Sequence, residues 1–163
     1  MRRSTHGFTL IEAVVATVIL SVVAAAVLPV VTGATETLSD ASQVERIVDE
    51  SCYAMDRIVR VLREAPPGTD PGTIGITSLG ASQVIFSDGS GCRVKGGVLQ
   101  IRFTDGVWGD LCDQVDAFEI RARDASGADS SDVPQQTQRF EVGLVRGGFE
   151  LRAVAFCRAR YGT

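Results

Sequence analysis

The chain has 163 residues, of which 45% are apolar, and its formal net charge at pH 7 is -4. This length fits a single domain with a modest core. The negative charge argues against a surface dominated by phosphate binding, so no direct nucleic acid partner is expected.

The first 31 residues divide into a short basic leader, residues 1–7, and an apolar run, residues 8–31. The only polar side chains of the run are Thr9, Glu12, Thr17 and Ser21. As a helix the run would measure about 36 Å at ~1.5 Å per residue, enough to cross a bilayer core of ~30 Å. Arginines precede the run and none follows it closely, so the leader should stay in the cytoplasm and the rest should face outward.

An ordinary secretory signal peptide is the competing interpretation, because it also combines a basic start with an apolar stretch. Three features count against it. Glu12 interrupts the apolar stretch, the run is longer than the usual 7–15 residues, and an amphipathic pattern continues directly beyond it.

The string from Gly7 to Glu12, Gly-Phe-Thr-Leu-Ile-Glu, followed by about twenty apolar residues, resembles the N-terminal signal of type IV pilins and type II secretion pseudopilins. The resemblance implies that a membrane-embedded prepilin peptidase cuts between Gly7 and Phe8. It also implies that Phe8 becomes N-methylated and that the leader is lost.

The same resemblance assigns Glu12 to assembly, as the partner of the N-terminal ammonium of a neighbouring subunit. A carboxylate inside a membrane is expected to find a positive partner or a wet cavity. The alternative is that Glu12 reaches the membrane interface from the first helical turn, where the helix dipole also favours a negative charge.

Pro29 lies where many proteins of this family bend their N-terminal helix. A proline inside a helix removes one hydrogen bond and clashes with the preceding turn, so a kink is predicted there. The alternative is that Pro29 and Gly33 together end the membrane helix.

Residues 32–65 continue as one amphipathic helix, because apolar residues recur there at spacings of three and four. The opposite face is charged, and the Pro66-Pro67-Gly68 sequence ends the helix. The apolar face of such a helix needs a cover, so the remaining chain should supply a sheet.

Residues 68–163 are predicted to form a β-rich head domain. Strands are expected at residues 83–87, 92–95, 98–104, 117–123, 140–145 and 149–157, with hairpin turns at Gly96-Gly97 and around Gly147-Gly148. The fold class is therefore α+β, a long N-terminal helix packed on an antiparallel sheet, which is also the pilin form that the resemblance implies.

Two head segments are candidate binding surfaces. Residues 124–137 are polar and should form an exposed loop. The segment 105–110 contains the only tryptophan, Trp108, which would either bind a ligand at the surface or pack in the core.

Four cysteines, Cys52, Cys92, Cys112 and Cys157, could pair in an oxidising compartment, and three connectivities are possible. The hypothesis is Cys92 with Cys112 and Cys52 with Cys157. A zinc site is disfavoured because no two cysteines have ligand-like spacing. Calcium at residues 88–90 or 129–132 is disfavoured because neither segment has an EF-hand frame. No metal and no cofactor are therefore expected.

No catalytic constellation is predicted. His6 is the only histidine and would be lost with the leader, which removes the commonest general base. The protein is therefore not expected to be an enzyme.

The function implied by the resemblance is structural, as a minor pseudopilin of type II secretion, of the J type. Its expected partners are other pilins or pseudopilins, the prepilin peptidase, the inner-membrane assembly platform and membrane lipid. The expected location is the cytoplasmic membrane, with the C-terminal head in the periplasm or outside. Two alternatives stay open. One is a minor pilin of a type IV pilus, for adhesion, motility or DNA uptake, and the other is a membrane-anchored protein whose head binds a ligand.

Overall fold

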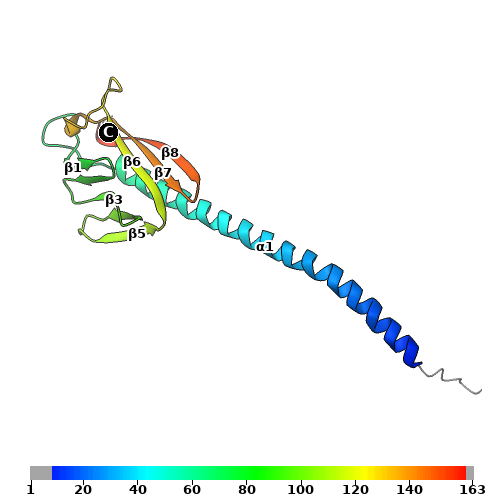
Figure 1. Ribbon diagram of the computed structural model, residues 1–163. Helices are drawn as coiled ribbons and strands as arrows, with labels where there is room; N and C mark the ends of the chain where they lie inside the picture. Colours follow the sequence, from blue (N-terminus) through cyan, green and yellow to red (C-terminus); the bar gives the residue numbers. More distant parts are fainter. Residues whose placement is uncertain (1–8, 161–163) are drawn as a thin grey trace, which may run out of the picture. The chain divides into compact units, whose positions relative to one another are not determined.

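A computed structural model describes residues 9–160 of the chain. A single α-helix, α1 (Leu10–Arg63), is followed by eight strands and two short 3-10 helices (Figure 1). The boundary between two compact units falls within α1, between Val44 and Glu45. The second unit holds the last turns of the helix and all the strands, and it is called the head below.

Helix α1 has the charge distribution that stabilises a long helix. Glu12 lies in its first turn, and Arg60 and Arg63 lie in its last, so each charge opposes the nearby end of the helix dipole. The helix continues through Pro29 and Gly33, so the interpretation that these two residues end it is wrong. The predicted kink at Pro29 stays a prediction.

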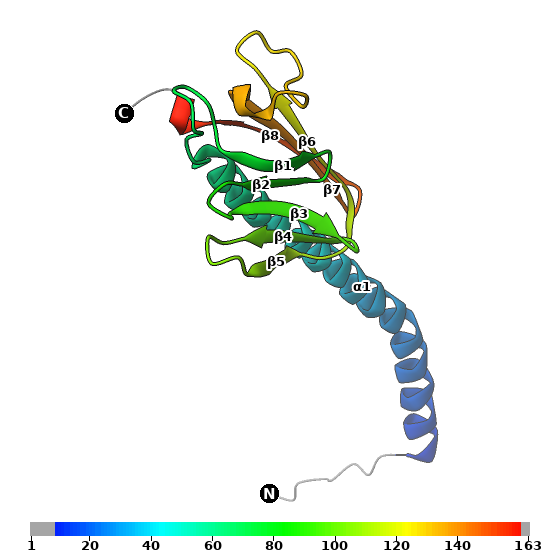
Figure 2. The same cartoon turned by 90° about the vertical axis from the view of Figure 1, so that its left-hand side faces the viewer.

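The first sheet is a five-stranded antiparallel meander of β1 (Ile76–Gly80), β2 (Gln83–Phe86), β3 (Gly91–Lys95), β4 (Val98–Arg102) and β5 (Trp108–Cys112) (Figure 2). The predicted two-residue turn between β3 and β4 is present. Gly96 and Gly97 both have positive φ, 61° and 76°, the conformation that a tight hairpin requires and that glycine adopts without strain.

The second sheet has three antiparallel strands, β6 (Val115–Arg123), β7 (Arg139–Arg146) and β8 (Phe149–Phe156), in that order. Two 3-10 helices flank its last strands, η1 (Pro134–Gln136) and η2 (Arg158–Arg160). The backbone N–H of Ile120 in β6 donates to the carbonyl of Ala81 in the β1–β2 turn at 2.7 Å, which joins the two sheets. The fold class is thus confirmed, with the strands divided between two sheets.

One core lies between the C-terminal part of α1 and both sheets. The helix contributes Ala54, Met55, Ile58 and Leu62, which recur at three- and four-residue spacing. The rings of Phe86, from the first sheet, and Phe140, from the second, meet edge to face with centroids 6.1 Å apart. This contact, like the helix, holds the two sheets in one hydrophobic unit.

Strands β1 and β5 are not predicted from the sequence. β1 contains Thr77, Ser78 and Gly80, and β5 contains Gly109 and Asp110, so neither has the alternation that marks a strand. Both are edge strands of their sheet, where one side of the backbone need not be covered.

All four cysteines are free thiols in the structure, which corrects the disulfide hypothesis. Cys92 on β3 lies opposite Ile101 on β4, whereas Cys112 on β5 lies opposite Leu99 on β4. Strand β4 therefore separates the two cysteines, by two strand spacings of ~4.8 Å, which exceeds the ~7 Å Cα separation that a disulfide can bridge. In the other proposed pair, Cys52 is exposed on the helix and Cys157 is buried.

Alkylation should therefore label one cysteine in the native protein. Burial raises the pKa of Cys92 and of Cys157 to about 12 and also raises the pKa of Cys112, so these thiols stay protonated and shielded. We expect iodoacetamide at pH 8 to modify Cys52 alone, and all four thiols after unfolding, as read by peptide mass spectrometry. Native labelling of Cys92 at the rate of Cys52 would contradict the described core.

Candidate functional site

The N-terminal half of α1 carries a continuous apolar surface. Helix α1 contains a stretch that is long and apolar enough to cross a membrane, and no part of that stretch is buried. Large apolar side chains are exposed all around it, namely Leu10, Ile11, Val14, Val15, Val18, Ile19, Leu20, Val22, Val23, Val27, Leu28, Val30 and Val31. Apolar patches of this extent mark membrane or protein contact sites.

Most polar side chains of this segment are satisfied within the helix. The hydroxyl of Thr17 donates to the carbonyls of Ala13 and Val14 at 3.1 and 2.8 Å. The Ser21 hydroxyl donates to the carbonyl of Thr17. Such bonds to the preceding turn let a hydroxyl lie in an apolar medium without an external partner.

Glu12 is the exception. Its backbone N–H donates to the carbonyl and the hydroxyl of Thr9, at 3.1 and 3.4 Å, so Thr9 caps the first turn. Among residues 9–160, no side chain forms an ion pair with the Glu12 carboxylate, and Glu12 is exposed. The predicted assembly residue is therefore held on a regular, capped helix with its carboxylate available to a partner.

Other predicted residues of the N-terminal signal lie outside the described residues. These are Gly7 and Phe8, at the expected cut, and His6. Their processing stays a prediction.

The head contains an ionic cluster that the sequence analysis did not identify. Arg146, at the end of β7, has a side chain only 5% exposed, and its Nη2 donates to Glu50 Oε2 on α1 at 2.8 Å. The same nitrogen lies 2.9 Å from Asp113 Oδ1, in the β5–β6 connection. Arg46 Nε reaches the other oxygen of Glu50, at 2.7 Å. The cluster therefore ties the helix to both sheets where α1 enters the head.

A sequence signal for this cluster did exist. Phe140, Val142, Leu144 and Arg146 alternate along β7, and all four are buried, so the period of two places Arg146 on the core side of the strand. A buried guanidinium requires carboxylates. The sequence does not show which carboxylates these are, because Glu50 and Asp113 are 96 and 33 residues away.

This cluster should make the head sensitive to acid. Hydrogen bonds from Arg46, and then from Arg146, hold the pKa of Glu50 below its ordinary value of 4.5. A lowered pKa in the folded state means that the stabilisation is complete above pH 4.5 and is lost as the pH falls through the folded value. We expect Glu50→Gln to lower the thermal midpoint at pH 7 and to lower it less at pH 3. An equal loss at both pH values, or a Glu64→Gln control with the same pattern, would contradict this assignment.

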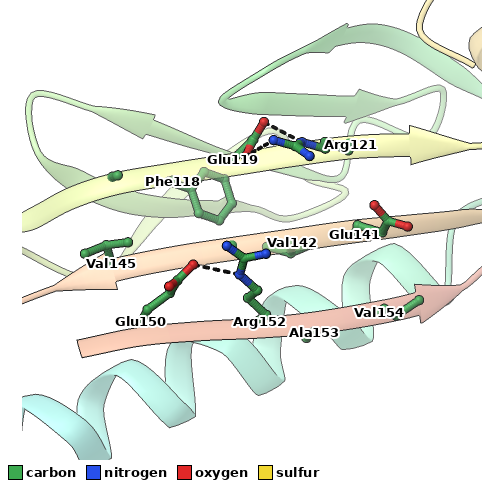
Figure 3. A pocket seen from close by; sticks show the side chains of 12 residues that line it. Phe118, Glu119, Arg121, Glu141, Val142, Val145, Glu150, Arg152, Ala153 and Val154 are labelled. Atoms are coloured by element: carbon green, nitrogen blue, oxygen red, sulfur yellow. Dashed lines mark hydrogen bonds and ion pairs between the residues drawn. The ribbon is translucent and has the colours of Figure 1, made fainter. Parts of the chain in front are cut away.

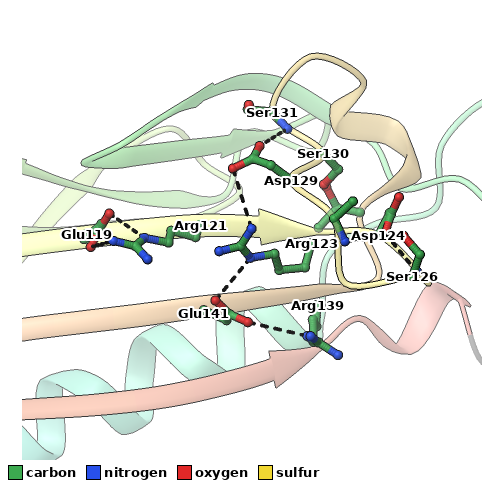
Figure 4. Close-up of polar contacts among 12 residues, drawn as sticks. Glu119, Arg121, Arg123, Asp124, Ser126, Asp129, Ser130, Ser131, Arg139 and Glu141 are labelled. Atoms are coloured by element: carbon green, nitrogen blue, oxygen red, sulfur yellow. Dashed lines mark hydrogen bonds and ion pairs between the residues drawn. The ribbon is translucent and has the colours of Figure 1, made fainter.

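The predicted exposed loop, residues 124–137, uses its carboxylates locally (Figure 4). Asp124 Oδ1 accepts hydrogen bonds from the N–H groups of Ser126 and Ala128, and Asp129 Oδ1 accepts one from the N–H of Ser131. The loop is not exposed throughout, because Ser130 and Thr137 are buried and share a hydrogen bond of 2.8 Å. These contacts are those of ordinary turns.

The outer face of the second sheet has a hollow of about 360 Å³ (Figure 3). Gly143, in the middle of β7, lines it, and a Cβ there would meet nothing within 4 Å. Ion pairs within single strands flank the hollow, Glu119 with Arg121 on β6 and Glu150 with Arg152 on β8. Glu141 also lines the hollow and pairs with Arg123 and Arg139, so each charged side chain of the lining is in an ion pair.

Trp108 is half-buried on β5, so it is neither a core residue nor a fully exposed one. The guanidinium carbon of Arg93 lies 3.9 Å from the centre of its ring. This distance is that of a cation–π contact.

Comparison with known proteins identifies one region of the chain. Residues 2–28 match the prokaryotic N-terminal methylation motif, and the matched segment contains Gly7, Phe8 and Glu12. No curated protein matches the chain. The unpartnered carboxylate and the capped first turn thus lie inside the segment that matches this motif.

Proposed function

Since residues 2–28 match the prokaryotic N-terminal methylation motif, which type IV pilins and pseudopilins carry, we propose that this chain is a structural subunit of a pilin-like filament. A prepilin peptidase would remove residues 1–7, and the chain would wait in the membrane, anchored by the apolar part of α1. Assembly would then transfer this helix from lipid into the filament.

The observation that carries this proposal is that the exposed Glu12 carboxylate has no ion-pair partner among residues 9–160. It is the one carboxylate in an exposed apolar stretch whose hydroxyl groups are satisfied within the helix. A charge in a bilayer costs several kcal/mol, about 2.5–3.5 by insertion scales, so an uncompensated Glu12 favours any state that supplies a cation. The ammonium of Phe8 in a neighbouring subunit is the cation that processing would create.

The proposed position of the head follows from the charges that flank the helix. Arg2 and Arg3 precede the apolar run, and residues 32–45 contain no Lys or Arg, so the positive-inside rule favours a cytoplasmic leader. The head would then lie in the periplasm or outside the cell. Its partners would be other pilins or pseudopilins and the inner-membrane assembly platform.

Within the family we propose a minor pseudopilin of type II secretion, as the strand-rich head suggests. A minor pilin of a type IV pilus is the second candidate, and it shares every N-terminal feature. A deletion strain separates the two, because the first predicts retained secretory cargo and the second predicts lost twitching, adhesion or DNA uptake.

A membrane-anchored ligand-binding protein is a candidate of another class, and the hollow above Gly143 is where its ligand would have to bind. Each charged side chain that lines the hollow already has an ion-pair partner, so none of them is unpaired and free to recognise a ligand. This candidate predicts an intact leader.

Processing of a Gly7 variant tests the proposal directly. In cells that contain a prepilin peptidase, we expect the native chain to be shortened and Gly7→Leu to keep its leader, as seen by electrophoresis of membrane fractions. Thr5→Ala is the matched leader variant and should be shortened normally. Equal mobility of the native chain and Gly7→Leu would refute the filament proposal and favour the anchored ligand-binding protein.

A further inference from the structure

The outer face of the first sheet carries two arginines that lie against the single tryptophan. Arg93 is on β3 and Arg102 is on β4, with their guanidinium carbons 3.9 and 5.7 Å from the centre of the Trp108 ring on β5. Arg102 lies directly opposite Trp108 in the strand register. The three side chains therefore form one group, called the arginine–tryptophan patch.

Each arginine of the patch is held in place through its Nε atom. Arg93 Nε donates to Gln100 Oε1 at 2.9 Å, and Arg102 Nε donates to the carbonyl of Gly106 at 3.2 Å. Within residues 9–160, neither arginine has a carboxylate oxygen within 4 Å. Their Nη groups are thus preorganised donors without a counter-charge, and paired Nη donors are suited to carboxylates.

The nearby carboxylates are engaged elsewhere. Asp105 Oδ1 accepts the N–H of Val107, and Asp110 Oδ1 accepts the side-chain amide of Gln100. Among the described residues, therefore, neither arginine has a direct ion-pair partner, on a chain whose net charge is -4.

Exposed apolar side chains adjoin the patch. Phe103 and Val107, in the β4–β5 connection, are 43% and 59% exposed. Tryptophan, arginine and phenylalanine are enriched at the centres of protein interfaces. This composition indicates a protein partner that presents carboxylates beside an apolar group.

The loop that joins β6 to β7 has this composition. Asp129 has a side chain 56% exposed, Asp132 is exposed, and Val133 is 46% exposed. No hydrogen bond or ion pair of the Asp132 side chain is found within the described part of the chain. Asp129 Oδ1 accepts the N–H of Ser131, and Asp129 Oδ2 lies 3.9 Å from Arg123 Nη1. Figures 1 and 2 show this loop and strand β5 at opposite ends of the head.

We propose that the arginine–tryptophan patch of one subunit binds the loop of a second copy of this chain. The carboxylates of Asp129 and Asp132 would accept hydrogen bonds from the Nη groups of Arg93 and Arg102, and Val133 would pack against Val107 and Trp108. The contact joins two different surfaces at opposite ends of the head. It is therefore heterologous, and a heterologous contact whose rotation does not close a ring builds an open filament. The inference rests on the proposed filament function and requires that copies of this chain are neighbours in the filament.

Cysteine crosslinking of the full-length chain in cells tests this contact. In a Cys52→Ser background, Val107→Cys combined with Val133→Cys should give a ladder of disulfide-linked oligomers after mild oxidation. Either cysteine alone should give no ladder, because the contact joins unlike surfaces. A ladder from Val107→Cys alone would overturn the proposal in favour of a symmetric contact.

Charge reversal then identifies the side chains that form the contact. We expect Arg93→Glu with Arg102→Glu to reduce the ladder about tenfold or more, since interface centres carry most of the binding energy. Adding Asp129→Arg and Asp132→Arg should restore it. Arg152→Glu, on the other sheet and 80% exposed, is the matched control and should leave the ladder unchanged.

The outcomes also separate this inference from the filament proposal. A chain that loses its leader and enters filaments but gives no ladder overturns the proposed contact alone. A ladder that withstands charge reversal overturns the role of the arginines. A chain that keeps its leader overturns the filament function, and the contact with it.

Discussion

Replacing Glu12 by glutamine should abolish entry into the filament while the leader is still removed. The variant keeps the shape of the side chain and the helix that Thr9 caps, but it has no charge to pair with an ammonium. Loss of one partner of a desolvated ion pair costs about 3–5 kcal/mol, so we expect filament incorporation to fall by about a hundredfold or more. Sedimentation of sheared filaments, followed by immunoblotting of filament and membrane fractions, measures this ratio.

The matched control is Glu36→Gln. Glu36 lies on the same helix and is exposed, but it follows the apolar stretch. This variant should assemble normally. Normal assembly of Glu12→Gln, or an equal defect in both variants, would show that the charge of Glu12 does not drive assembly.

The largest expected change in stability comes from removing both carboxylates that face Arg146. The combined variant Glu50→Ala with Asp113→Ala leaves a guanidinium whose side chain is only 5% exposed and whose Nε already has no partner among the described residues. An uncompensated charge on this guanidinium should lower the free energy of unfolding by more than the loss of an exposed ion pair would. Thermal and urea unfolding followed by circular dichroism in detergent would measure the loss.

Adding Arg146→Met to this variant distinguishes the buried charge from lost packing. Methionine fills much of the same space without a charge, so the triple variant should recover a large part of the lost stability, because buried ionic groups can be replaced by apolar ones at little cost. Glu150→Ala, which breaks the exposed pair with Arg152, should cost at most about 1 kcal/mol. A triple variant less stable than the double one would contradict the account.

Much of the fold could be predicted because its signals are local. The spacing of Ala54, Ile58 and Leu62 predicts the buried face of α1. The glycine pair Gly96-Gly97 predicts the β3–β4 hairpin, because glycine readily adopts the positive φ values that this turn has. In both cases neighbouring residues determine the structure, by helical periodicity and by backbone sterics.

The features of the fold that could not be predicted from the sequence depend on contacts between distant segments. The division into two sheets arises because β5 pairs with β4 whereas β6 pairs with β7. The chain changes sheet at Gln114, which has a positive φ of 52°, but residues 111–117 contain no glycine or proline that would indicate this change in the sequence. The error in pairing Cys92 with Cys112 has the same origin, since only the register of β3, β4 and β5 shows that a strand separates them.

The candidate site likewise contains one residue that the sequence alone identifies and clusters that only the fold brings together. Glu12 could be identified from the sequence because a carboxylate in an apolar run is conspicuous without any knowledge of the fold. The ion-pair cluster of Arg146 could not be assembled in this way, since its members come from α1, the β5–β6 connection and β7. The arginine–tryptophan patch likewise requires the pairing of β3 with β4 and β5.

The mass of the mature N-terminus tests the central claim most directly. The chain would be purified from membranes of cells with and without a prepilin peptidase, and its N-terminal peptide would be analysed by mass spectrometry. The account predicts a chain that begins at N-methylated Phe8, found only when the peptidase is present. A chain that begins at Met1 or Arg2 in both strains would contradict it.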